Sequence, residues 1–386
     1  ELAWLMGQSG IQLSDNSPAA EALKRGAPGN GNYAMNLQQL GLLSSIRPVA
    51  LSPECAEAIG ILGKPDAETT LLWGNPEKIG NASFLSTREM GPAMRVAYTR
   101  GPDNINHLGY FISDETIVDI VKNTLDFAEL TEAPDLSINI SSRALPVFFG
   151  LLDIFQEERL RAALDRRTGL NPDFSPSALK RVITDGQMEP ILSWYAALGS
   201  LITSGTGIPD EASLQQGLGE LRRAGIISGT GDKTLFSPGL TTFAHRAFPI
   251  AGYCVIKTAG DKGTHIETQQ AAFIRGVTAM LFIHTADEAG TTLQLESICS
   301  TDVVPPLFQI LSLPFESLPQ QSSRNAKVAG GNICPKCGTH NPDGMKFCGN
   351  CGADLTPKPK VNYCPKCGDV VKAGEKFCDK CGTRIN

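Results

Sequence analysis

The sequence predicts an α+β fold with a duplicated body, followed by two small cysteine-rich units. Three observations lead to this prediction. Short alternating strands and amphipathic helices follow one another through residues 1–313. Five short landmarks recur in one order at a nearly constant offset along the chain. Eight of the 11 cysteines lie between residues 334 and 381.

The five landmarks pair segments of similar composition. They are Leu2–Trp4 with Leu192–Trp194, Gln38–Leu43 with Leu221–Ile227, Leu51–Pro53 with Phe236–Pro238, Ala93–Val96 with Ala279–Phe282, and Ile112–Asp114 with Cys299–Thr301. Each pair alone is a weak signal, but five pairs in one order indicate an internal duplication. Two unrelated α+β segments are the alternative.

The second copy begins with a helix and a hairpin. Glu211–Ala224 has leucines at helical spacing, and Gly225 is placed to end that helix. A short apolar strand, a glycine-rich turn, a second strand and the helix-starting pair Ser237-Pro238 follow. This order resembles the end of a winged-helix domain.

Antiparallel strands and a closing helix are expected after each such segment. In the first copy the strands are Thr69–Trp73, Ala82–Thr87, Met94–Thr99 and Leu108–Phe111, with a helix over Thr116–Phe127. In the second copy they are Tyr253–Lys257, His265–Gln269, Ala279–His284 and Thr292–Ser297, with a helix over Val303–Leu311. Between the copies, Pro146–Arg167 is expected to be a helix whose charged residues from Glu157 onward are solvated.

The cysteines near the C-terminal end form two copies of the pattern C-x2-C-x10-C-x2-C. The candidate metal ligands are Cys334, Cys337, Cys348 and Cys351 in the first copy and Cys364, Cys367, Cys378 and Cys381 in the second. Two thiolates on a tight turn hold one face of a tetrahedral ion, and a second turn closes the other face. Each copy is too small to fold on a hydrophobic core alone, so bound metal is expected to supply its fold.

Zinc is the metal that this pattern favours. Four cysteines complete each site, so no position stays open for water and both sites are expected to be structural. His340 lies inside the first copy and is interpreted as a surface residue, because four thiolates already complete that site. The alternatives are iron in all-sulfur coordination, disulfides, and a redox role for the C-x-x-C pairs.

The cysteine pattern resembles the double zinc ribbon family over residues 334–381. The resemblance implies two structural zinc ions and ribbons that act as interaction modules appended to another domain. The predicted organisation is a first α+β lobe (1–130), a helical connector (131–189), a second lobe with the winged-helix-like segment (190–313), a flexible linker (314–333) and two ribbons (334–356 and 361–386).

The distribution of charge argues against a nucleic-acid partner. Residues 327–386 carry ten Lys and Arg against five Asp and Glu, so the preceding residues carry 24 against 35, a formal charge of −11. An acidic body is a poor surface for phosphate backbones. The cysteine usage predicts a reducing cytoplasm, and no apolar run approaches the length of a membrane span. Because the chain begins at Glu1, a missing leading segment is expected.

No catalytic site stands out in the sequence. The histidines of the body are scattered, although His265 and His284 fall on predicted strands that could bring them face to face. No carboxylate pair suited to acid–base work is apparent. The remaining cysteines, Cys55, Cys254 and Cys299, are predicted to be buried free thiols. The chain is therefore not expected to be an enzyme.

The favoured function is a non-enzymatic cytoplasmic adaptor or chaperone-like scaffold for protein partners, with the ribbons as docking modules. The two-lobed α+β plan is loosely similar to the EspG-like chaperones of type VII secretion, although no motif matches and no residue is carried over. The alternative is a winged-helix and zinc-ribbon regulator that binds nucleic acid. Its candidate helix Ser213–Ala224 offers only Arg222 and Arg223 at its end, which disfavours this alternative.

Overall fold

The structure is a computed structural model of the 386-residue chain. It describes residues 5–6, 17, 33–46, 49–75, 78–88, 95–100, 106–127, 131, 133–188, 195–203, 208–229, 234–263, 265–287, 291–315, 332–333, 340–341, 362–363 and 370–371. The chain divides into two compact units, Glu1–Leu318 and Pro319–Asn386. We call the first unit the body and the second the tail.

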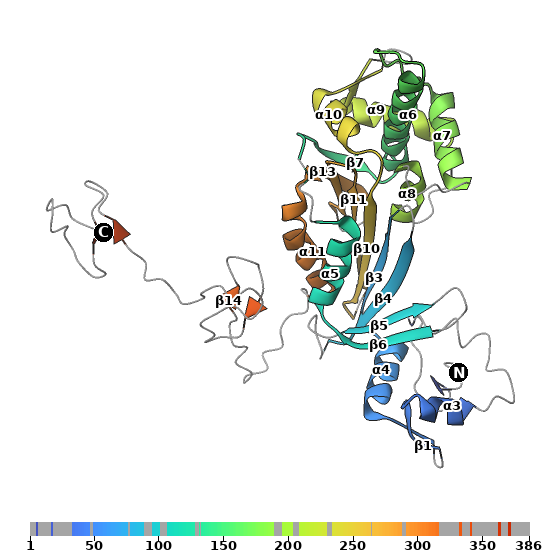
Figure 1. Cartoon of the computed structure of the whole chain (residues 1–386), viewed down its shortest axis with the longest axis vertical. Coiled ribbons are helices and arrows are strands. Elements are labelled where there is room, and N and C mark those ends of the chain that lie inside the picture. The colour runs from blue at the N-terminus through green and yellow to red at the C-terminus, as the bar shows by residue number, and fades with distance from the viewer. Residues whose placement is uncertain are drawn as a thin grey trace. The chain divides into compact units, whose positions relative to one another are not determined.

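A nine-stranded antiparallel sheet forms the centre of the body (Figure 1), in the order β6-β5-β4-β3-β10-β11-β12-β13-β7. The strands are β3 (Ala67–Gly74), β4 (Ile79–Ser86), β5 (Arg95–Arg100), β6 (Asn106–Ile112), β7 (Ser137–Ser141), β10 (Gly252–Asp261), β11 (Ile266–Arg275), β12 (Met280–Thr285) and β13 (Thr292–Ile298). The sheet contains every strand predicted after the two helix–hairpin segments, which confirms the α+β class. The signal for these strands in the sequence is a set of short runs rich in apolar and β-branched residues between turn residues.

Strands β3 and β10 join the two halves of the chain. In this antiparallel pair Leu71 lies opposite Ile256, and Thr70 lies opposite Lys257. Strands from both predicted lobes therefore belong to one hydrogen-bonded sheet rather than to two. The domain boundaries given by the sequence stay a prediction.

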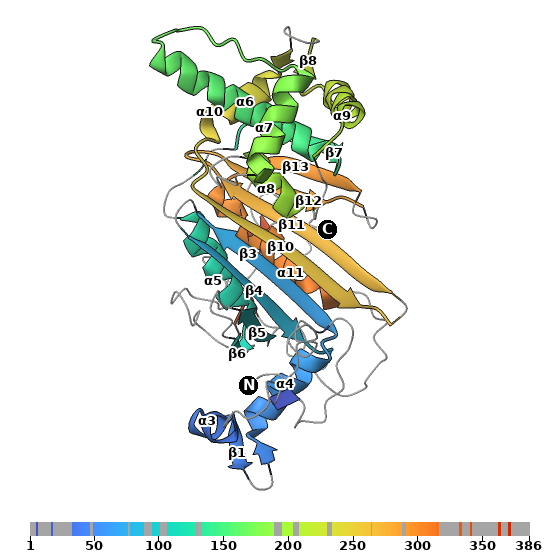
Figure 2. The ribbon, with the colours of Figure 1, turned by 90° about the vertical axis from the view of Figure 1, so that its right-hand side faces the viewer.

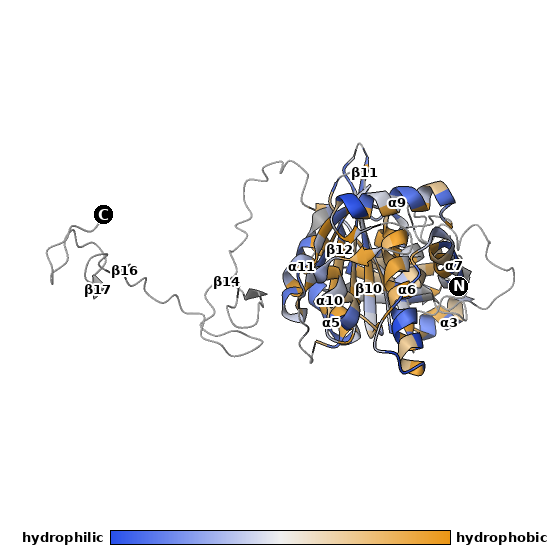
Figure 3. Cartoon of the chain, turned by 90° about the horizontal axis from the view of Figure 1, so that it is seen from above, coloured by the Kyte–Doolittle hydropathy of each residue, from blue (hydrophilic) through white to orange (hydrophobic). Residues whose placement is uncertain are grey.

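Helices α5 (Asp114–Leu125) and α11 (Val304–Ser312) cover one face of the sheet (Figure 1). Their apolar sides pack on a buried cluster that includes Leu71, Ile117, Ile256 and Phe273. Each such side chain contributes roughly 1.5–3 kcal/mol when it leaves water. Viewed from above, the hydrophobic residues gather in the central strands (Figure 3), as expected for a sheet between helical layers.

The second face of the sheet carries two separate groups of elements (Figure 2). Beside β4–β6 lie α3 (Tyr33–Gln39), β1 (Leu43–Ile46), β2 (Val49–Leu51) and α4 (Pro53–Gly63), with their own apolar cluster. The group at the other end of the sheet consists of α6 (Leu145–Leu164), α7 (Pro176–Met188), α8 (Tyr195–Ile202), α9 (Glu211–Arg223), β8 (Ile227–Ser228), β9 (Leu235–Phe236) and α10 (Pro238–Arg246). These two groups leave strands β3 and β10 between them.

Two segments of the body share the order helix, hairpin, helix: α3-β1-β2-α4 and α9-β8-β9-α10. In each segment a glycine with positive φ follows the first helix, Gly41 at +74° and Gly225 at +71°. In each, a serine side chain caps the second helix, Ser52 for α4 and Ser237 for α10. The duplication and the winged-helix kinship both stay predictions.

Two expectations about the segment between the copies were wrong. The segment is not wholly helical, because β7 precedes α6 and pairs with β13. The charged end of α6 is not wholly solvated either. Glu158 is buried, and its carboxylate accepts hydrogen bonds from Asn171 N at 2.9 Å and Arg167 Nη1 at 3.0 Å. These bonds hold the pKa of Glu158 below its ordinary value.

The scattered histidines and thiols of the body form no common site among the residues that the structure describes. His265 precedes β11, while His284 on β12 lies opposite Ala271, so the two histidines do not face each other. Cys55 and Cys254 are buried free thiols as predicted, whereas Cys299 is partly exposed. Within the described ranges, each helix is too short or too polar to span a lipid bilayer.

Candidate functional site

A groove crosses the second face of the sheet beside α8. It consists of two adjoining cavities of about 450 Å³ and 420 Å³. Thr70 on β3 and Lys257 on β10 line both cavities. The groove therefore lies over the strand pair that joins the two halves of the chain.

One transverse row of side chains runs along the groove from strand to strand. Its members, from β5 to β13, are Tyr98, Ser83, Thr70, Lys257, Gln270, Thr285 and Leu293. Each lies opposite or bonded to the next, and all of them line one or both cavities. Since side chains alternate between the faces of a strand, the register of the sheet fixes this row.

The row is rich in hydroxyl and amide groups and poor in charge. Among the described residues that line the groove, Lys257 is the one cation and Glu68 the one carboxylate. Thr70 Oγ1 donates to Glu68 Oε1 at 3.3 Å. Burial lowers the pKa of the Lys257 ammonium. Such a surface offers many neutral donors and acceptors and almost no net charge.

Apolar side chains line the cavity on the β5 side. Leu72 lies opposite Val255 in the β3–β10 pair, and Leu201 reaches the same cavity from α8. Leu72 and Leu201 are only partly buried. The groove thus combines an apolar section with a polar row, the mixture that binding sites for polypeptides and small molecules use.

Helix α8, which forms a wall of the groove, is fixed at both ends. At its start, the Asp153 carboxylate of α6 accepts hydrogen bonds from Tyr195 N at 2.9 Å and Ala196 N at 2.7 Å. At its end, Gln270 Nε2 from the row donates to Ile202 O. The first contact supplies acceptors to amides that have no partner within the helix.

Asp153 is an unusual capping group because it is 1% exposed. Burial raises the pKa of its carboxyl to about 7, although the amides of Ala196 and Tyr195 act in the opposite direction. The position of α8, and with it the width of the groove, depends on Asp153 at the start of the helix and on Gln270 at its end.

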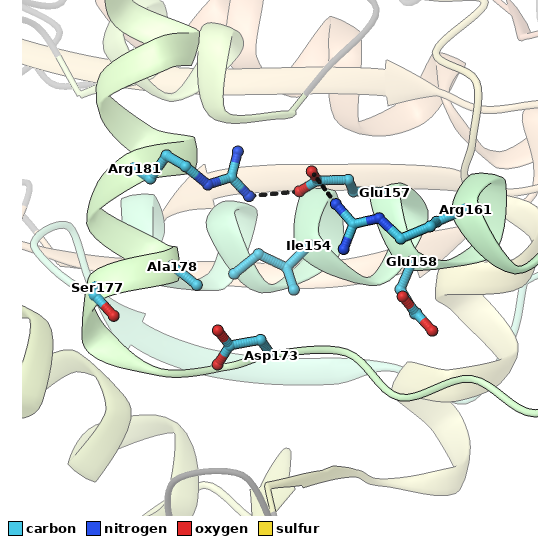
Figure 4. A pocket seen from close by; sticks show the side chains of 8 residues that line it. All are labelled: Ile154, Glu157, Glu158, Arg161, Asp173, Ser177, Ala178 and Arg181. Carbon is cyan, nitrogen blue, oxygen red and sulfur yellow. Dashed lines mark hydrogen bonds and ion pairs between the residues drawn. The ribbon is translucent and has the colours of Figure 1, made fainter.

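A second pocket, of about 580 Å³, lies between α6 and α7 (Figure 4). Glu157, Arg161 and Arg181 of this pocket form ion pairs with one another. Glu157 binds Arg161 at 3.0 Å and Arg181 at 2.6 Å, and Asp173 Oδ1 accepts from Ser175 N at the start of α7. Since Glu157 of α6 is already paired with Arg161 and with Arg181 of α7, we interpret this pocket as an ion-pair network that holds the two helices together.

In the tail, two short hairpins frame the first cysteine pair of each copy. Asn332–Ile333 (β14) pairs with His340–Asn341 (β15), and Asn362–Tyr363 (β16) pairs with Val370–Val371 (β17). The second register repeats the first, shifted along the chain by the same number of positions as the second cysteine pattern. The eight predicted ligands themselves lie outside the described residues. His340 occupies the strand position that Val370 occupies in the second copy. Its interpretation as a surface residue that does not bind the metal stays a prediction.

This arrangement fits a zinc ion in each copy. The hairpin brings the ends of the C-x-x-C loop together, and four cysteine thiolates per copy are a donor set that suits tetrahedral zinc.

A known family model matches the part of the tail that contains the two cysteine patterns. Residues 334–382 match the model of the double zinc ribbon family. The C-terminal segment is a double zinc ribbon. This family binds zinc, while the number of ions held by the ribbon and the individual ligands stay predictions.

No curated protein matches the chain. Among solved structures, a similar chain belongs to the type VII secretion system chaperone EspG5 of Mycobacterium tuberculosis, in complex with a PE25–PPE41 dimer. The two chains are 12% identical, with a TM-score of 0.43, over 80% of this chain and 93% of the other. This is consistent with the loose resemblance that the sequence suggested.

Sequence reasoning assigned no role to the residues that form the groove or position its wall. Lys257 directly follows the uncharged run Tyr253–Ile256. Asp153 is the one charged residue within the otherwise apolar run Leu151–Phe155. A lone charge inside an apolar element was the available signal in both cases.

Proposed function

We propose that the protein is a non-enzymatic, chaperone-like adaptor that holds a segment of a protein partner in the groove. The observation that carries this proposal is the transverse row of hydroxyl and amide side chains next to an apolar section. A polypeptide presents donors and acceptors at short intervals, and hydroxyl and amide groups can satisfy both. The partly buried Leu72 and Leu201 would cover an apolar side chain of the same segment.

The charges support a protein partner over a nucleic acid. The groove has one cation and one carboxylate among its described lining residues, and the chain before residue 327 has a formal charge of −11. The arginines at the end of α9 form hydrogen bonds within their own helix–hairpin segment. Arg222 Nε donates to Gly229 O at 2.8 Å and Arg223 Nε to Gly219 O at 3.4 Å. A regulator that reads DNA with this helix would need such side chains to reach the bases.

The ribbons are proposed to dock a second protein, so that the chain links two partners in a reducing cytoplasm. The zinc sites are proposed to be structural, with two ions per chain, because each copy offers four thiolates and leaves no coordination position for water. Eight cysteines held as zinc thiolates also agree with a reducing compartment.

The body is proposed to have arisen by duplication of a helix–hairpin–helix unit followed by strands. The glycine pair Gly41 and Gly225 and the capping pair Ser52 and Ser237, separated by nearly the same length of chain, support this origin. The two sets of strands, β3–β6 and β10–β13, follow in the same order in each half.

Capture from the native cytoplasm tests the proposed function. The tagged full-length chain, its Ser83→Arg variant and a chain of residues 1–318 are compared, with Asn123→Arg as the matched control. Ser83 lies in the groove, whereas Asn123 is exposed on α5 at the other face. One partner should be lost with Ser83→Arg alone, and a different partner with the shortened chain alone. Equal recovery of every partner by Ser83→Arg and wild type contradicts the proposal.

A further inference from the structure

We propose that the cavity of about 450 Å³ on the β5 side of the groove binds a tyrosine side chain of the partner segment. The ring of this tyrosine lies on the apolar section of the cavity, and its phenol hydroxyl reaches the polar row. This inference rests on the proposed function of the groove and adds to it the side chain that anchors the segment.

Three aliphatic side chains carry the first part of the argument. Leu72 and Val255 lie opposite each other on β3 and β10, and Leu201 lines the same cavity from α8. Leu72 and Leu201 are only partly buried, so a ring that enters this section removes further apolar surface from water. Aromatic side chains bury about 150–250 Å² each and dominate the energetics of protein interfaces.

Two hydroxyl groups carry the second part. Thr70 and Ser83 lie opposite each other on β3 and β4, and both line the cavity. Thr70 and Leu72 are two residues apart on one face of β3, a separation of about 6.5–7 Å, which is comparable to the reach of a tyrosine side chain. The cavity therefore has an apolar section followed by hydroxyl groups, and tyrosine has the matching order of an apolar ring and a polar tip.

The two hydroxyl groups can bond a phenol. Thr70 Oγ1 donates to Glu68 Oε1 at 3.3 Å, which leaves its lone pairs to accept from the phenol O–H. The Ser83 hydroxyl is half-buried and forms no hydrogen bond within the part of the chain that the structure describes, so it can donate to the phenol oxygen. Lys257, the one cation among the described lining residues, already has a partner within the chain. A neutral anchor therefore fits this cavity better than an acidic one.

A displayed peptide library tests this anchor. Random dodecapeptides, held at both ends in a phage coat protein, are selected on the full-length chain, and those that also bind Ser83→Arg are discarded. Wild type should enrich Tyr at one position over Phe, Leu and every other residue. The double variant Thr70→Val/Ser83→Ala, which lacks both hydroxyl groups, should enrich Phe at least as strongly as Tyr. Ser228→Ala, an exposed change on β8, should select as wild type does.

A synthetic peptide from the selection gives the quantitative readout. Replacing its tyrosine by Phe should weaken binding to wild type about three- to tenfold, as expected for a lost hydrogen bond. The same replacement should change binding to the double variant by less than about twofold. Replacing the tyrosine by Ala should weaken binding to wild type about thirtyfold or more. The Phe peptide should bind the double variant at least as tightly as it binds wild type, which shows that this variant is folded.

The outcomes separate this inference from the proposed function. Groove-dependent peptides that lack the tyrosine, or that carry Phe or Leu equally often in its place, overturn the inference and leave the proposed function standing. An equal loss on Tyr→Phe in wild type and in the double variant does the same. A library without any peptide sensitive to Ser83→Arg overturns both.

Discussion

Arg95 and Asp114 form a buried ion pair between β5 and the first turn of α5, with Arg95 Nε 2.8 Å from Asp114 Oδ1. The Arg95 side chain is fully buried, and it also donates to Thr69 Oγ1 at 2.9 Å and to Leu311 O at 2.8 Å. Phe315 covers the guanidinium at 5.3 Å. One side chain thus ties a strand of the sheet to both helices on its covered face.

Removing Arg95 should destabilise the body strongly. Arg95→Met leaves Asp114, whose pKa burial already raises and Arg95 lowers, without its cation, and it leaves Thr69 and Leu311 without a donor. We expect a loss of about 3–5 kcal/mol in the free energy of unfolding, measured with urea. Arg181→Met, which removes the exposed pair with Glu157, should cost at most about 1 kcal/mol. Equal losses in the two variants would contradict a central role for Arg95.

Asp153 should make the stability of the body fall as the pH rises from about 4 to about 7. Its pKa is about 7 in the folded protein against an ordinary 3.8, so the folded state binds the proton more tightly than the unfolded chain. Because proton binding and folding are linked, the free energy of unfolding should fall by up to about 4 kcal/mol between these pH values.

Urea unfolding at pH 5 and pH 8 measures this effect in wild type, Asp153→Asn and the exposed control Asp119→Asn. The stability of wild type relative to Asp153→Asn should be lower at pH 8 than at pH 5. Asp119→Asn should have about the same free energy of unfolding as wild type at both pH values. A difference between wild type and Asp153→Asn that stays constant or changes in the opposite direction would contradict the assignment.

The tail should hold two zinc ions per chain, because two Cys₄ patterns share the same spacing and the same hairpin register. Mass spectrometry of metal content should give two zinc ions, and one after Cys334→Ser or Cys364→Ser. A strong chelator should remove the metal without lowering the thermal midpoint of the body, which is a separate compact unit. A metal count near zero or near four would show that the two sites are wrongly assigned.

The full-length chain should bind duplex DNA weakly. With a formal charge of −11 on residues 1–326 and the α9 arginines bonded to their own segment, anisotropy with random duplex at about 150 mM salt should show binding weaker than the usual non-specific range of about 10⁻⁴–10⁻⁶ M, or at its weak edge. Micromolar binding that persists in a chain of residues 1–318 would favour the nucleic-acid regulator instead.

Sequence patterns predicted the elements of the sheet better than its assembly. Short runs of apolar and β-branched residues such as Thr69–Trp73 and Tyr253–Lys257 indicated the strands, because the length and composition of a run are local properties. The β3–β10 pairing was not predicted, since it joins segments from opposite halves of the body and no local signal encodes it. Strand β7 was missed although its sequence, Ser-Ile-Asn-Ile-Ser, alternates. This short strand directly precedes the strongly apolar helix α6 in sequence, and the long helix is the stronger local signal.

Of the two candidate sites, the metal site could be predicted from the sequence and the groove could not. The cysteine pattern predicted the double zinc ribbon because metal-ligand spacing is local in sequence. The groove was not predicted, because its row takes one side chain from each of seven strands. Arg95 and Asp153 appear in the sequence as lone charges in apolar elements, and their partners become visible only in the folded body.

The central claim, that the groove holds a polypeptide, is tested most directly by cross-linking in the native cytoplasm. A photoreactive benzoylphenylalanine replaces Thr70 in the groove or Asn123 on the opposite face. The account predicts that position 70 cross-links to one protein, that Ser83→Arg removes this product, and that position 123 gives no such product. No cross-link at position 70, or the same product from both positions, would contradict it.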